Sequence, residues 1–339
     1  MRSGTVALLG RTNVGKSTFL NAALGERLAI VSSRPQTTRD ALLGIVHRPE
    51  AQIAFVDTPG LHRPRTELGR RMNAAARDAA RATDAVILMT DVGTLLGSRK
   101  GAARSPLHEE DAAIYREVPT ATKVVVVINK IDLLRDKLQL LPLIAAWNAV
   151  REPDAIVPVS ALTEDGVERV IEAVVPLLPE GPPAWEPDAL TDRPTRFFAR
   201  EFVREQVLEA TRGEVPHAVA VSIDEIREAG ESLSIRATLH VEKAGQRGIL
   251  VGQGGAQIKA IGTAARLRLQ ELAGKRVHLE LFVRVTPRWK DVPRQLAELG
   301  YDAPTGGAGD APAPVPEAAA GASSRPRRRS TRGRQRSSR

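Results

Sequence analysis

The segment Gly10-Arg-Thr-Asn-Val-Gly-Lys-Ser17 decides the fold of the first half of this 339-residue chain. The short apolar run 5–9 before it is typical of a buried strand, and residues 17–24 after it have the apolar spacing of a helix. A glycine-bounded loop between a strand and a helix N-terminus presents several backbone N–H groups to one point, where the helix dipole favours anions. The segment therefore predicts a phosphate-binding loop, with Lys16 at the β- and γ-phosphates and the Ser17 hydroxyl at Mg²⁺.

A second motif, Asp57-Thr-Pro-Gly60, follows the apolar run 51–56. A carboxylate at the end of a strand can hold Mg²⁺, usually through water, and the Gly60 N–H can reach a γ-phosphate because glycine permits a close approach. By itself this pattern fits any turn after a strand. Its value comes from its position between the first and the third motif.

The third motif, Asn129-Lys-Ile-Asp132, follows a run of β-branched residues that is typical of a strand buried on both faces. Guanine presents N1–H and N2–H₂ side by side, and the ionised carboxylate of Asp132 can accept both hydrogen bonds. Adenine has an acceptor at N1, so the same carboxylate rejects it. Ser160-Ala161, after the run 156–159, would bring a backbone N–H near the guanine O6. In this order the four motifs predict a guanine-nucleotide site.

The polar stretch 32–40 lies between the first two motifs and has no apolar periodicity, so it is expected to be a loop. A hydroxyl from Thr37 or Thr38 could complete the Mg²⁺ shell when a γ-phosphate is bound, and the loop would then order with GTP and loosen after hydrolysis. The alternative is an ordinary surface loop. The sequence does not choose between the two threonines.

Leu61 stands where GTPases of the Ras type carry the glutamine that orients the attacking water. Leucine cannot do this, so the catalytic residue is unknown, and Lys16 and Thr38 are expected only to support the transition state and the switch. Intrinsic hydrolysis is expected to be slow unless another group or a partner positions the water. In related bacterial GTPases an asparagine at the place of Asn13 can help to hold K⁺ near the phosphates, which makes K⁺ a hypothesis here.

The expected site residues fall into two groups. Those expected to bind GTP or GDP are Gly10, Asn13, Val14, Gly15, Lys16, Ser17, Thr18, Thr37, Thr38, Asp57, Gly60, Asn129, Lys130, Asp132, Ser160 and Ala161. Those expected around Mg²⁺ are Ser17, Thr37, Thr38 and Asp57.

The composition excludes several other classes of protein. There is no cysteine, which excludes a disulfide framework and a cysteine-ligated metal, and the six histidines have no metal-binding spacing. No apolar run approaches the roughly 20 residues of a membrane span, and no signal peptide is expected at the start. The chain is therefore expected in the cytoplasm.

Three changes of composition divide the chain. Strands and helices alternate through residues 1–178, which predicts an α/β domain with a mostly parallel sheet and helices on both faces. Residues 179–193 are rich in proline and are expected to be a linker. Residues 302–339 carry eight arginines against three acidic residues, and are expected to be a disordered basic tail that attracts polyanions. The alternative is a solvated tail without a specific role.

Residues 194–301 are expected to form a smaller α+β domain. The patterns predict a helix over 195–210, strands over 217–226 and 231–241, two helices between 245 and 272, and a strand over 276–285. A short helix over 292–299, capped by Asp291, is expected to follow. A Gly-x-x-Gly loop separates the two helices, and this order is that of a type II KH domain, which binds about four single-stranded nucleotides. A plain tight turn between helices is the alternative. The residues expected to bind RNA are Gly252, Gln253, Gly254, Gly255, Lys259 and Arg266, and Arg268 follows on the same helix.

A GTPase domain followed directly by one KH domain resembles the bacterial Era family, over residues 3–301. The resemblance rests on the phosphate-loop motif and on Pro35-Gln-Thr-Thr-Arg39, Asp57-Thr-Pro-Gly-Leu-His62, Val215-Pro-His-Ala-Val-Ala-Val221 and Val277-His-Leu-Glu-Leu281. It implies a GTP-hydrolysing switch that binds the 3′ end of 16S rRNA and acts in 30S ribosomal subunit biogenesis. It also implies peripheral contact of some members with the inner face of the cell membrane. A monomer is expected.

Two other functions stay open. The chain could be an RNA-binding protein whose nucleotide is mainly structural, or a GTPase that acts on another RNA or on a membrane partner. Three departures from the family also matter: Thr12 replaces a usual proline, the loop Gly252–Gly255 lacks a common lysine, and residues 97–106 and the tail are additional. We hypothesise that the additional segments supply RNA-backbone contacts that the loop lacks.

Overall fold

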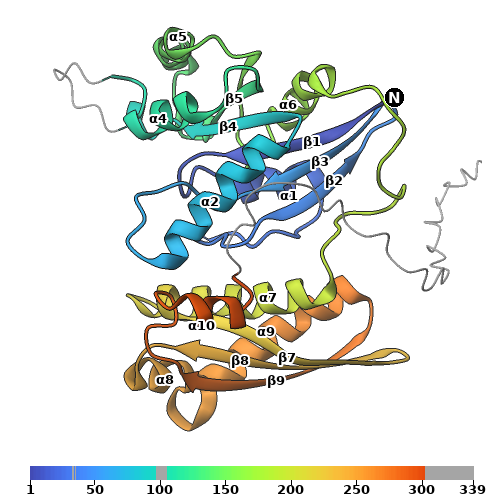
Figure 1. Ribbon diagram of the computed structural model, residues 1–339, viewed down its shortest axis with the longest axis vertical. Coiled ribbons are helices and arrows are strands. Elements are labelled where there is room, and N and C mark those ends of the chain that lie inside the picture. Colours follow the sequence, from blue (N-terminus) through green and yellow to red (C-terminus); the bar gives the residue numbers. More distant parts are fainter. Residues whose placement is uncertain (33, 35, 97–104, 302–339) are drawn as a thin grey trace, which may run out of the picture. The chain divides into compact units, whose positions relative to one another are not determined.

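The computed structural model describes residues 1–32, 34, 36–96 and 105–301, which build two β-sheets and the helices that cover them (Figure 1). Most of the additional segment 97–106 and the whole tail 302–339 fall outside the described residues. The hypothesis about their RNA contacts therefore stays a prediction.

The first sheet has six strands in the order β2-β3-β1-β4-β5-β6. Strand β2 pairs with β3 in antiparallel register, and the other four pairings are parallel. The strands are β1 Arg2–Leu9, β2 Leu42–His47, β3 Ala51–Asp57, β4 Ala85–Asp91, β5 Lys123–Asn129 and β6 Ala155–Pro158. Parallel neighbours need long crossovers, which the alternation of strands and helices supplies.

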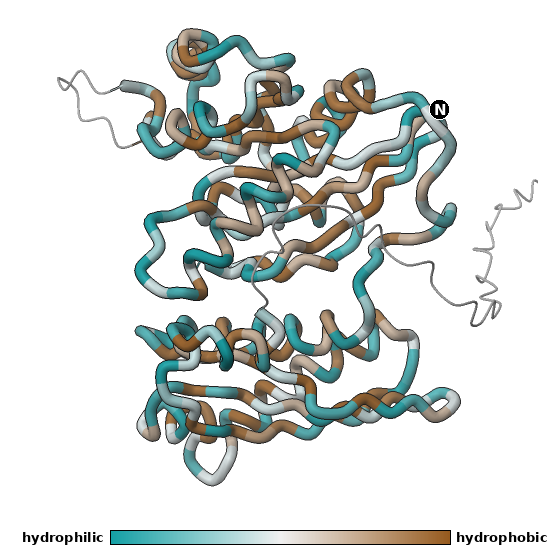
Figure 2. Tube along the Cα trace, in the orientation of Figure 1, coloured by the Kyte–Doolittle hydropathy of each residue, from teal (hydrophilic) through white to brown (hydrophobic). Residues whose placement is uncertain are grey.

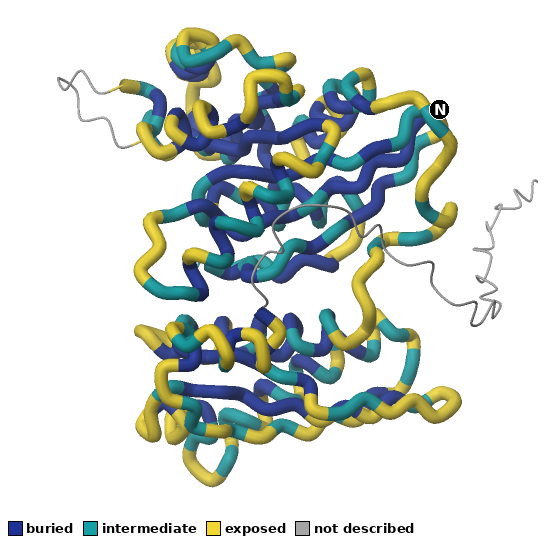
Figure 3. The backbone as a smooth tube through the Cα atoms, in the orientation of Figure 1, coloured by how far each residue is buried: buried dark blue, intermediate teal, exposed yellow. Residues whose placement is uncertain are grey.

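Helices cover both faces of this sheet, because successive side chains of a strand point to opposite faces. On β1, Val6 and Leu8 pack in the cluster that includes α1 and α6, whereas Ala7 and Leu9 pack with α2, α4 and α5. The helices are α1 Lys16–Leu24, α2 Glu67–Ala82, α3 Gly93–Leu96, α4 Glu109–Glu117, α5 Leu140–Val150 and α6 Val167–Val174. The strands are hydrophobic and buried along most of their length (Figures 2 and 3). The expected α/β class is confirmed.

The second sheet has the order β7-β8-β9, with β7 antiparallel and β9 parallel to β8. Its strands are β7 Ala220–Ala229, β8 Ser232–Val241 and β9 Arg276–Val285, and its helices are α7 Thr195–Ala210, α8 Ala244–Val251, α9 Ala256–Ala273 and α10 Pro293–Glu298. Leu233, Ile235 and Leu239 face the helices and are buried. The element order α-β-β-α-α-β confirms the expected type II KH arrangement.

Two boundaries in this half differ from the expected ones. The strand expected from His217 begins at Ala220, because Val215–Ala218 form a 3₁₀ turn around Pro216, whose ring fixes φ and removes an N–H donor. Helix α10 was expected to be capped by Asp291, but its N-cap is Val292, without a side-chain hydrogen bond.

The proline-rich connection between the two sheets is hydrogen-bonded to the first sheet. The Gln52 side chain on β3 accepts hydrogen bonds from the Ala184 and Trp185 N–H groups at 2.7 and 2.8 Å, and the Ile45 N–H on β2 donates to the Leu190 carbonyl at 2.9 Å. The sequence predicts a division into residues 1–178, 179–193 and 194–301. That these are separate folding units stays a prediction.

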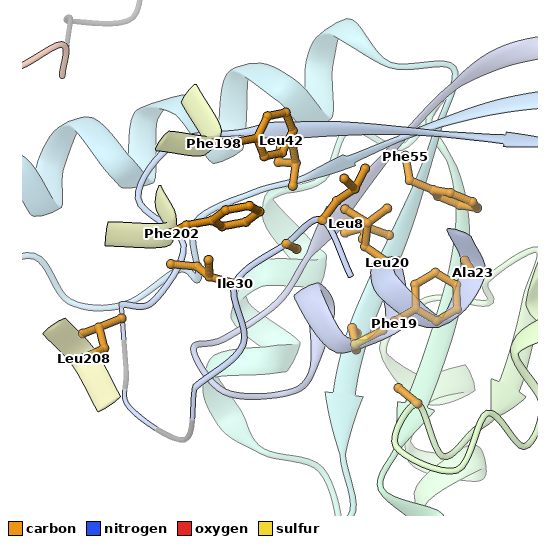
Figure 4. Packing of buried hydrophobic residues seen from close by; sticks show 14 of the residues in the cluster. Leu8, Phe19, Leu20, Ala23, Ile30, Leu42, Phe55, Phe198, Phe202 and Leu208 are labelled. Atoms are coloured by element: carbon orange, nitrogen blue, oxygen red, sulfur yellow. The ribbon is translucent and has the colours of Figure 1, made fainter. Parts of the chain in front are cut away.

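The two halves also share a hydrophobic cluster, part of which Figure 4 shows. Phe198 and Phe202 of α7 belong to the same buried cluster as Ile30 and Leu42 of the first half. Removing such apolar area from water stabilises the contact by about 25 cal/mol per Å². None of the helices in the described part of the chain is long and apolar enough to cross a bilayer.

Candidate nucleotide and RNA sites

The loops that carry the sequence motifs meet at one edge of the first sheet. The four motifs follow β1, β3, β5 and β6, and the carboxyl ends of parallel strands lie at the same edge. The strand register sets Leu8 beside Asp57 and Asp91 beside Asn129. The fold therefore gathers segments that lie far apart in the sequence.

Two glycines are required by the geometry of the loop after β1. Gly10 has φ 144° and Gly15 has φ 104°, a region that favours glycine. A Cβ atom on Gly10 would clash with the Met89 carbonyl oxygen, and one on Gly15 would clash with Nδ2 of Asn129. Gly15 is the N-cap of α1, so the helix N-terminus opens onto the loop.

Lys16 is almost fully buried at the first turn of α1. Its ammonium group donates hydrogen bonds to the carbonyl oxygens of Gly10 at 3.2 Å and Arg11 at 2.9 Å. Burial lowers the pKa of Lys16 to about 8, because desolvation disfavours the charged form. A bound anion would favour the charged form again, so this lysine is suited to hold phosphate.

Three oxygen-bearing side chains meet at the start of α1. The Ser17 hydroxyl donates to Asp57 Oδ2 at 2.6 Å and lies 2.9 Å from the Thr38 hydroxyl, which is itself 3.3 Å from Asp57 Oδ2. The Thr37 hydroxyl instead donates to the Arg34 carbonyl at 2.7 Å. The geometry thus brings Thr38, and not Thr37, to Ser17 and Asp57.

The Asp57 carboxylate is suited to a divalent cation. It is buried, burial raises its pKa, and its Oδ1 has no hydrogen-bond partner among the described residues. A buried carboxylate oxygen without a partner is costly unless a cation or water meets it. With the hydroxyls of Ser17 and Thr38 it makes a set of hard oxygen ligands that fits Mg²⁺, which prefers few protein ligands together with substrate phosphates.

Asn129 hydrogen-bonds to three loops at the opposite end of the site. Its Nδ2 donates to the Val14 carbonyl at 2.8 Å, and its Oδ1 accepts from the N–H groups of Lys130 at 2.7 Å and Ala161 at 2.9 Å. Lys130 in turn donates to the Asn13 carbonyl at 2.8 Å. Three motifs are therefore joined by one buried amide.

A cavity of about 540 Å³ runs between these two ends. The expected residues that line it are Asn13, Gly15, Lys16, Ser17, Thr18, Thr37, Thr38, Gly60, Asn129, Lys130 and Asp132. Asp132 is exposed, so its carboxylate is open to a base. The other expected residues, Gly10, Val14, Asp57, Ser160 and Ala161, are buried and are not among the lining residues.

The RNA-binding residues were expected around the loop between α8 and α9. Gly252, Gly254 and Gly255 all have positive φ, and a Cβ atom on Gly254 or Gly255 would meet nothing within 4 Å, so a backbone could approach there. Gln253 and Lys259 are exposed. The Arg266 guanidinium, which is half-buried, donates to the Gln270 side chain.

Comparison with known proteins then decides the family. Residues 5–130 match the model described as 50S ribosome-binding GTPase, and residues 214–290 match the KH domain. GTPase Era of Geobacter metallireducens is 44% identical over 302 residues, covering 88% of this chain and 98% of that protein. GTPase Era of Xanthomonas campestris pv. campestris strain B100 is 43% identical over 303 residues, covering 89% and 98%.

The chain belongs to the GTPase Era family. It is similar to the crystal structure of a point variant of Aquifex aeolicus Era bound to GDP·AlF₄⁻, with a TM-score of 0.82 and 36% identity, covering 89% of this chain and 100% of that one. A structure of Era with MgGDPNP and nucleotides 1506–1542 of 16S ribosomal RNA matches with the same score and identity, covering 89% and 99%. Membership of the Era family makes this chain a GTPase.

Some lining residues of this Era-family site were not expected from the sequence: Thr12, Ile30, Val31, Ser32, Gln36, Leu133 and Leu162. Leu133 and Leu162 directly follow Asp132 and Ala161, and they are 51% and 77% exposed. Apolar side chains beside the carboxylate that recognises a base can cover the faces of that base. The position of these two leucines in the sequence could therefore have identified them as candidate site residues.

Arg268 does not face the Gly-x-x-Gly loop. It pairs with the buried Glu205, lies 4.1 Å from the ring centroid of Phe202, and donates to the Arg27 carbonyl at 2.9 Å. These contacts direct it toward α7 and the first half of the chain. Of the three basic residues after the loop, Lys259 is thus the exposed one. Arg268 is bonded to Glu205 and to the Arg27 carbonyl instead.

Proposed function

We propose that this chain is a GTP-controlled switch that binds the 3′-end region of 16S rRNA through its KH domain and acts in assembly of the 30S ribosomal subunit. The likeness to the Era structure that holds MgGDPNP and nucleotides 1506–1542 of 16S rRNA supports this, because it extends over 89% of the chain. Relatives at 44% and 43% identity across nearly their whole length support it as well.

In this proposal the loop from Gly10 to Ser17 holds the phosphates, with Lys16 at the β- and γ-phosphates. Asp132 reads the guanine edge, while Asn129 holds the surrounding loops in place. Ser17, Thr38 and Asp57 would hold Mg²⁺, which would neutralise phosphate charge. The Thr37 hydroxyl is the less suited of the two candidates, since it is bonded to Arg34.

One observation carries the switch proposal: the loop that holds Thr38 is also bound by the KH half. The buried Arg204 of α7 donates to the Thr37 carbonyl and pairs with Glu201. The Arg200 guanidinium of α7 bonds to Asp40 at 2.7 Å. A change in this loop on exchange of GTP for GDP would therefore act directly on α7.

A further contact binds the end of the same loop. Arg39, which is 5% exposed, donates to the Val219 carbonyl at 2.7 Å, and its guanidinium lies 5.5 Å from the ring centroid of Trp289. A buried arginine that bonds to the KH half needs this partner, because an unpaired buried donor is costly. This contact adds a second route by which the nucleotide state could reach the KH domain.

The RNA proposal assigns the contact to Gly252–Gly255 and Lys259, with Arg266 beside them. It is tested by binding of the full chain to a single-stranded 16S 3′-end oligonucleotide and to a scrambled strand of equal length. Preference for the first would support the proposal. Equal affinity would favour a GTPase that serves another RNA, and absence of binding to either would contradict the RNA-binding function.

Three finer parts belong to the same proposal. We propose K⁺ as a second cation near Asn13, where it would add positive charge at the phosphates. We also propose a monomer, and peripheral contact with the inner face of the cell membrane. Equal hydrolysis rates in Na⁺ and K⁺ buffers, a dimer in sedimentation, and no binding to anionic vesicles would contradict these three statements respectively.

A further inference from the structure

Leu61 cannot orient the water that attacks GTP. It is 7% exposed and packs in the hydrophobic cluster on one face of the first sheet, and its N–H donates to the Gly10 carbonyl at 3.1 Å. It is not among the lining residues of the nucleotide cavity. For this chain to hydrolyse GTP, another group must hold the water.

Gln36 is an amide side chain in the wall of the nucleotide cavity. It lines the cavity together with Lys16, Thr38 and Gly60, the residues assigned to the γ-phosphate end. Its φ is 62°, a region in which a residue other than glycine costs about 1–2 kcal/mol. Such a cost is sustained only when neighbouring contacts hold the backbone, and these include the bond from Arg204 to the Thr37 carbonyl.

The ring of His62 determines which end of the Gln36 amide faces the cavity. His62 Nδ1 lies 3.0 Å from the Gly60 carbonyl oxygen, and His62 Nε2 lies 3.0 Å from the Gln36 amide nitrogen. A carbonyl oxygen only accepts, so Nδ1 carries a proton; an amide nitrogen only donates, so Nε2 is the acceptor. Gln36 must then donate its N–H to the ring, which leaves its Oε1 to accept a hydrogen bond from water.

His62 itself is fixed by helix α2. The Asn73 side chain, which is 5% exposed, donates through Nδ2 to the His62 carbonyl at 2.6 Å. Asn73 Oδ1 accepts from the His62 N–H at 3.4 Å. The residue is therefore anchored on one side by α2 and on the other by the Gly60 carbonyl, so its ring can hold the glutamine amide in one orientation.

We propose that Gln36 is the catalytic residue that orients the attacking water, and that His62 is its positioning residue. The water oxygen bonds to the γ-phosphorus, and the bond from that phosphorus to the β–γ bridging oxygen breaks with its electron pair left on GDP. One water proton stays on the attacking oxygen and the other passes to a phosphate oxygen. Gln36 neither gives up nor takes a proton; it supplies from the loop 32–40 the amide that other GTPases supply after the Asp-x-x-Gly motif.

The test is single-turnover GTP hydrolysis by the full chain with Mg²⁺, together with affinities for GDP and for GDP with aluminium fluoride. The variants are Gln36→Ala, His62→Ala and the double variant, with Arg65→Ala as the control, an exposed residue of the same loop as His62. We expect Gln36→Ala to slow hydrolysis by about tenfold to a thousandfold and to weaken binding with aluminium fluoride by a similar factor. GDP affinity should change by less than about twofold, because Gln36 lies at the γ-phosphate end of the cavity and GDP has no γ-phosphate.

The double variant tests the positioning role, because two residues that act as a unit are not additive. We expect the double variant to be no slower than Gln36→Ala. A further loss on adding His62→Ala would contradict the positioning role of His62. An unchanged rate in Gln36→Ala, or a rate loss matched by an equal loss of GDP affinity, would overturn the catalytic role. Failure of the unmodified chain to hydrolyse GTP would instead contradict the proposed function itself.

Discussion

The side-chain oxygen of Asn129 accepts a hydrogen bond from the Ala161 N–H at 2.9 Å, across 32 positions of sequence. The same amide donates to the Val14 carbonyl at 2.8 Å. Because both bonds are buried, Asn129 sets the distance between the phosphate loop and the loop that follows β6. A substrate that carries phosphates at one end and a base at the other needs that distance to be constant.

Replacement of Asn129 by alanine should weaken nucleotide binding. The change leaves the Val14 carbonyl and the Ala161 N–H without partners, and each buried unpaired group costs about 1–3 kcal/mol. We expect the Kd for GDP to rise by about tenfold to a hundredfold. The measurement is titration with a fluorescent GDP analogue, and Asn148→Ala on the exposed face of α5 is the control. An unchanged Kd would show that the amide does not set the geometry of the site.

Asp132→Asn should change the base that the site accepts. A carboxylate accepts from both N1–H and N2–H₂ of guanine, whereas an amide offers one acceptor and one donor. That pair matches xanthine, which has a carbonyl at position 2. We expect GTP affinity to fall by about tenfold or more and xanthosine triphosphate affinity to rise. Competition binding between the two nucleotides measures this change of base preference. A retained preference for GTP would show that Asp132 does not recognise the base.

The two adjacent threonines should respond differently to loss of the hydroxyl. Thr38→Val removes a group that lies 2.9 Å from the Ser17 hydroxyl, so it should raise the Mg²⁺ concentration that GTP binding and hydrolysis require. Thr37→Val removes only a bond to the Arg34 carbonyl and should cost about 0.5–1.5 kcal/mol of local stability. The Mg²⁺ concentration for half-maximal hydrolysis decides between them. A larger shift for Thr37→Val would reverse the assignment.

Arg200→Ala should weaken the coupling between the nucleotide site and the KH half. It removes the bond between α7 and Asp40 while leaving the nucleotide cavity intact. The difference between the RNA affinities of the GDP and GTP states should then shrink without vanishing, because the bonds from Arg204 to Thr37 and from Arg39 to Val219 remain. Nucleotide affinity should stay within about twofold of the unmodified chain. Arg294→Ala is the control, because that arginine forms an exposed pair with Glu298. If the variant keeps the full difference between states, the bond to Asp40 is not part of the coupling.

The motifs and the two folds could be predicted because each rests on local patterns. Apolar runs located β1, β3, β5 and β6 of the first sheet and the three strands of the second, whereas β2 and β4 were not singled out. Helix α7 was expected over the residues at which it is found. The choice between Thr37 and Thr38 could not be made, because two adjacent hydroxyls in an aperiodic loop are equivalent until the backbone direction is known.

Contacts between distant segments were the other part that the sequence did not reveal. The bond from Arg204 to the Thr37 carbonyl joins residues 167 positions apart, and nothing local to either predicts it. Gln36 was overlooked for a related reason, since its role depends on the ring of His62, which reaches it from another loop.

Nucleotide-dependent RNA affinity tests the central claim most directly. The full chain, loaded with GDP or with a non-hydrolysable GTP analogue, is titrated with a single-stranded 16S 3′-end oligonucleotide at one fixed salt concentration. The account predicts tighter binding in the GTP state by about tenfold, or about 1.4 kcal/mol of coupling. Equal affinity in the two states would contradict it, because the loop that α7 binds would then not couple the nucleotide site to the RNA site.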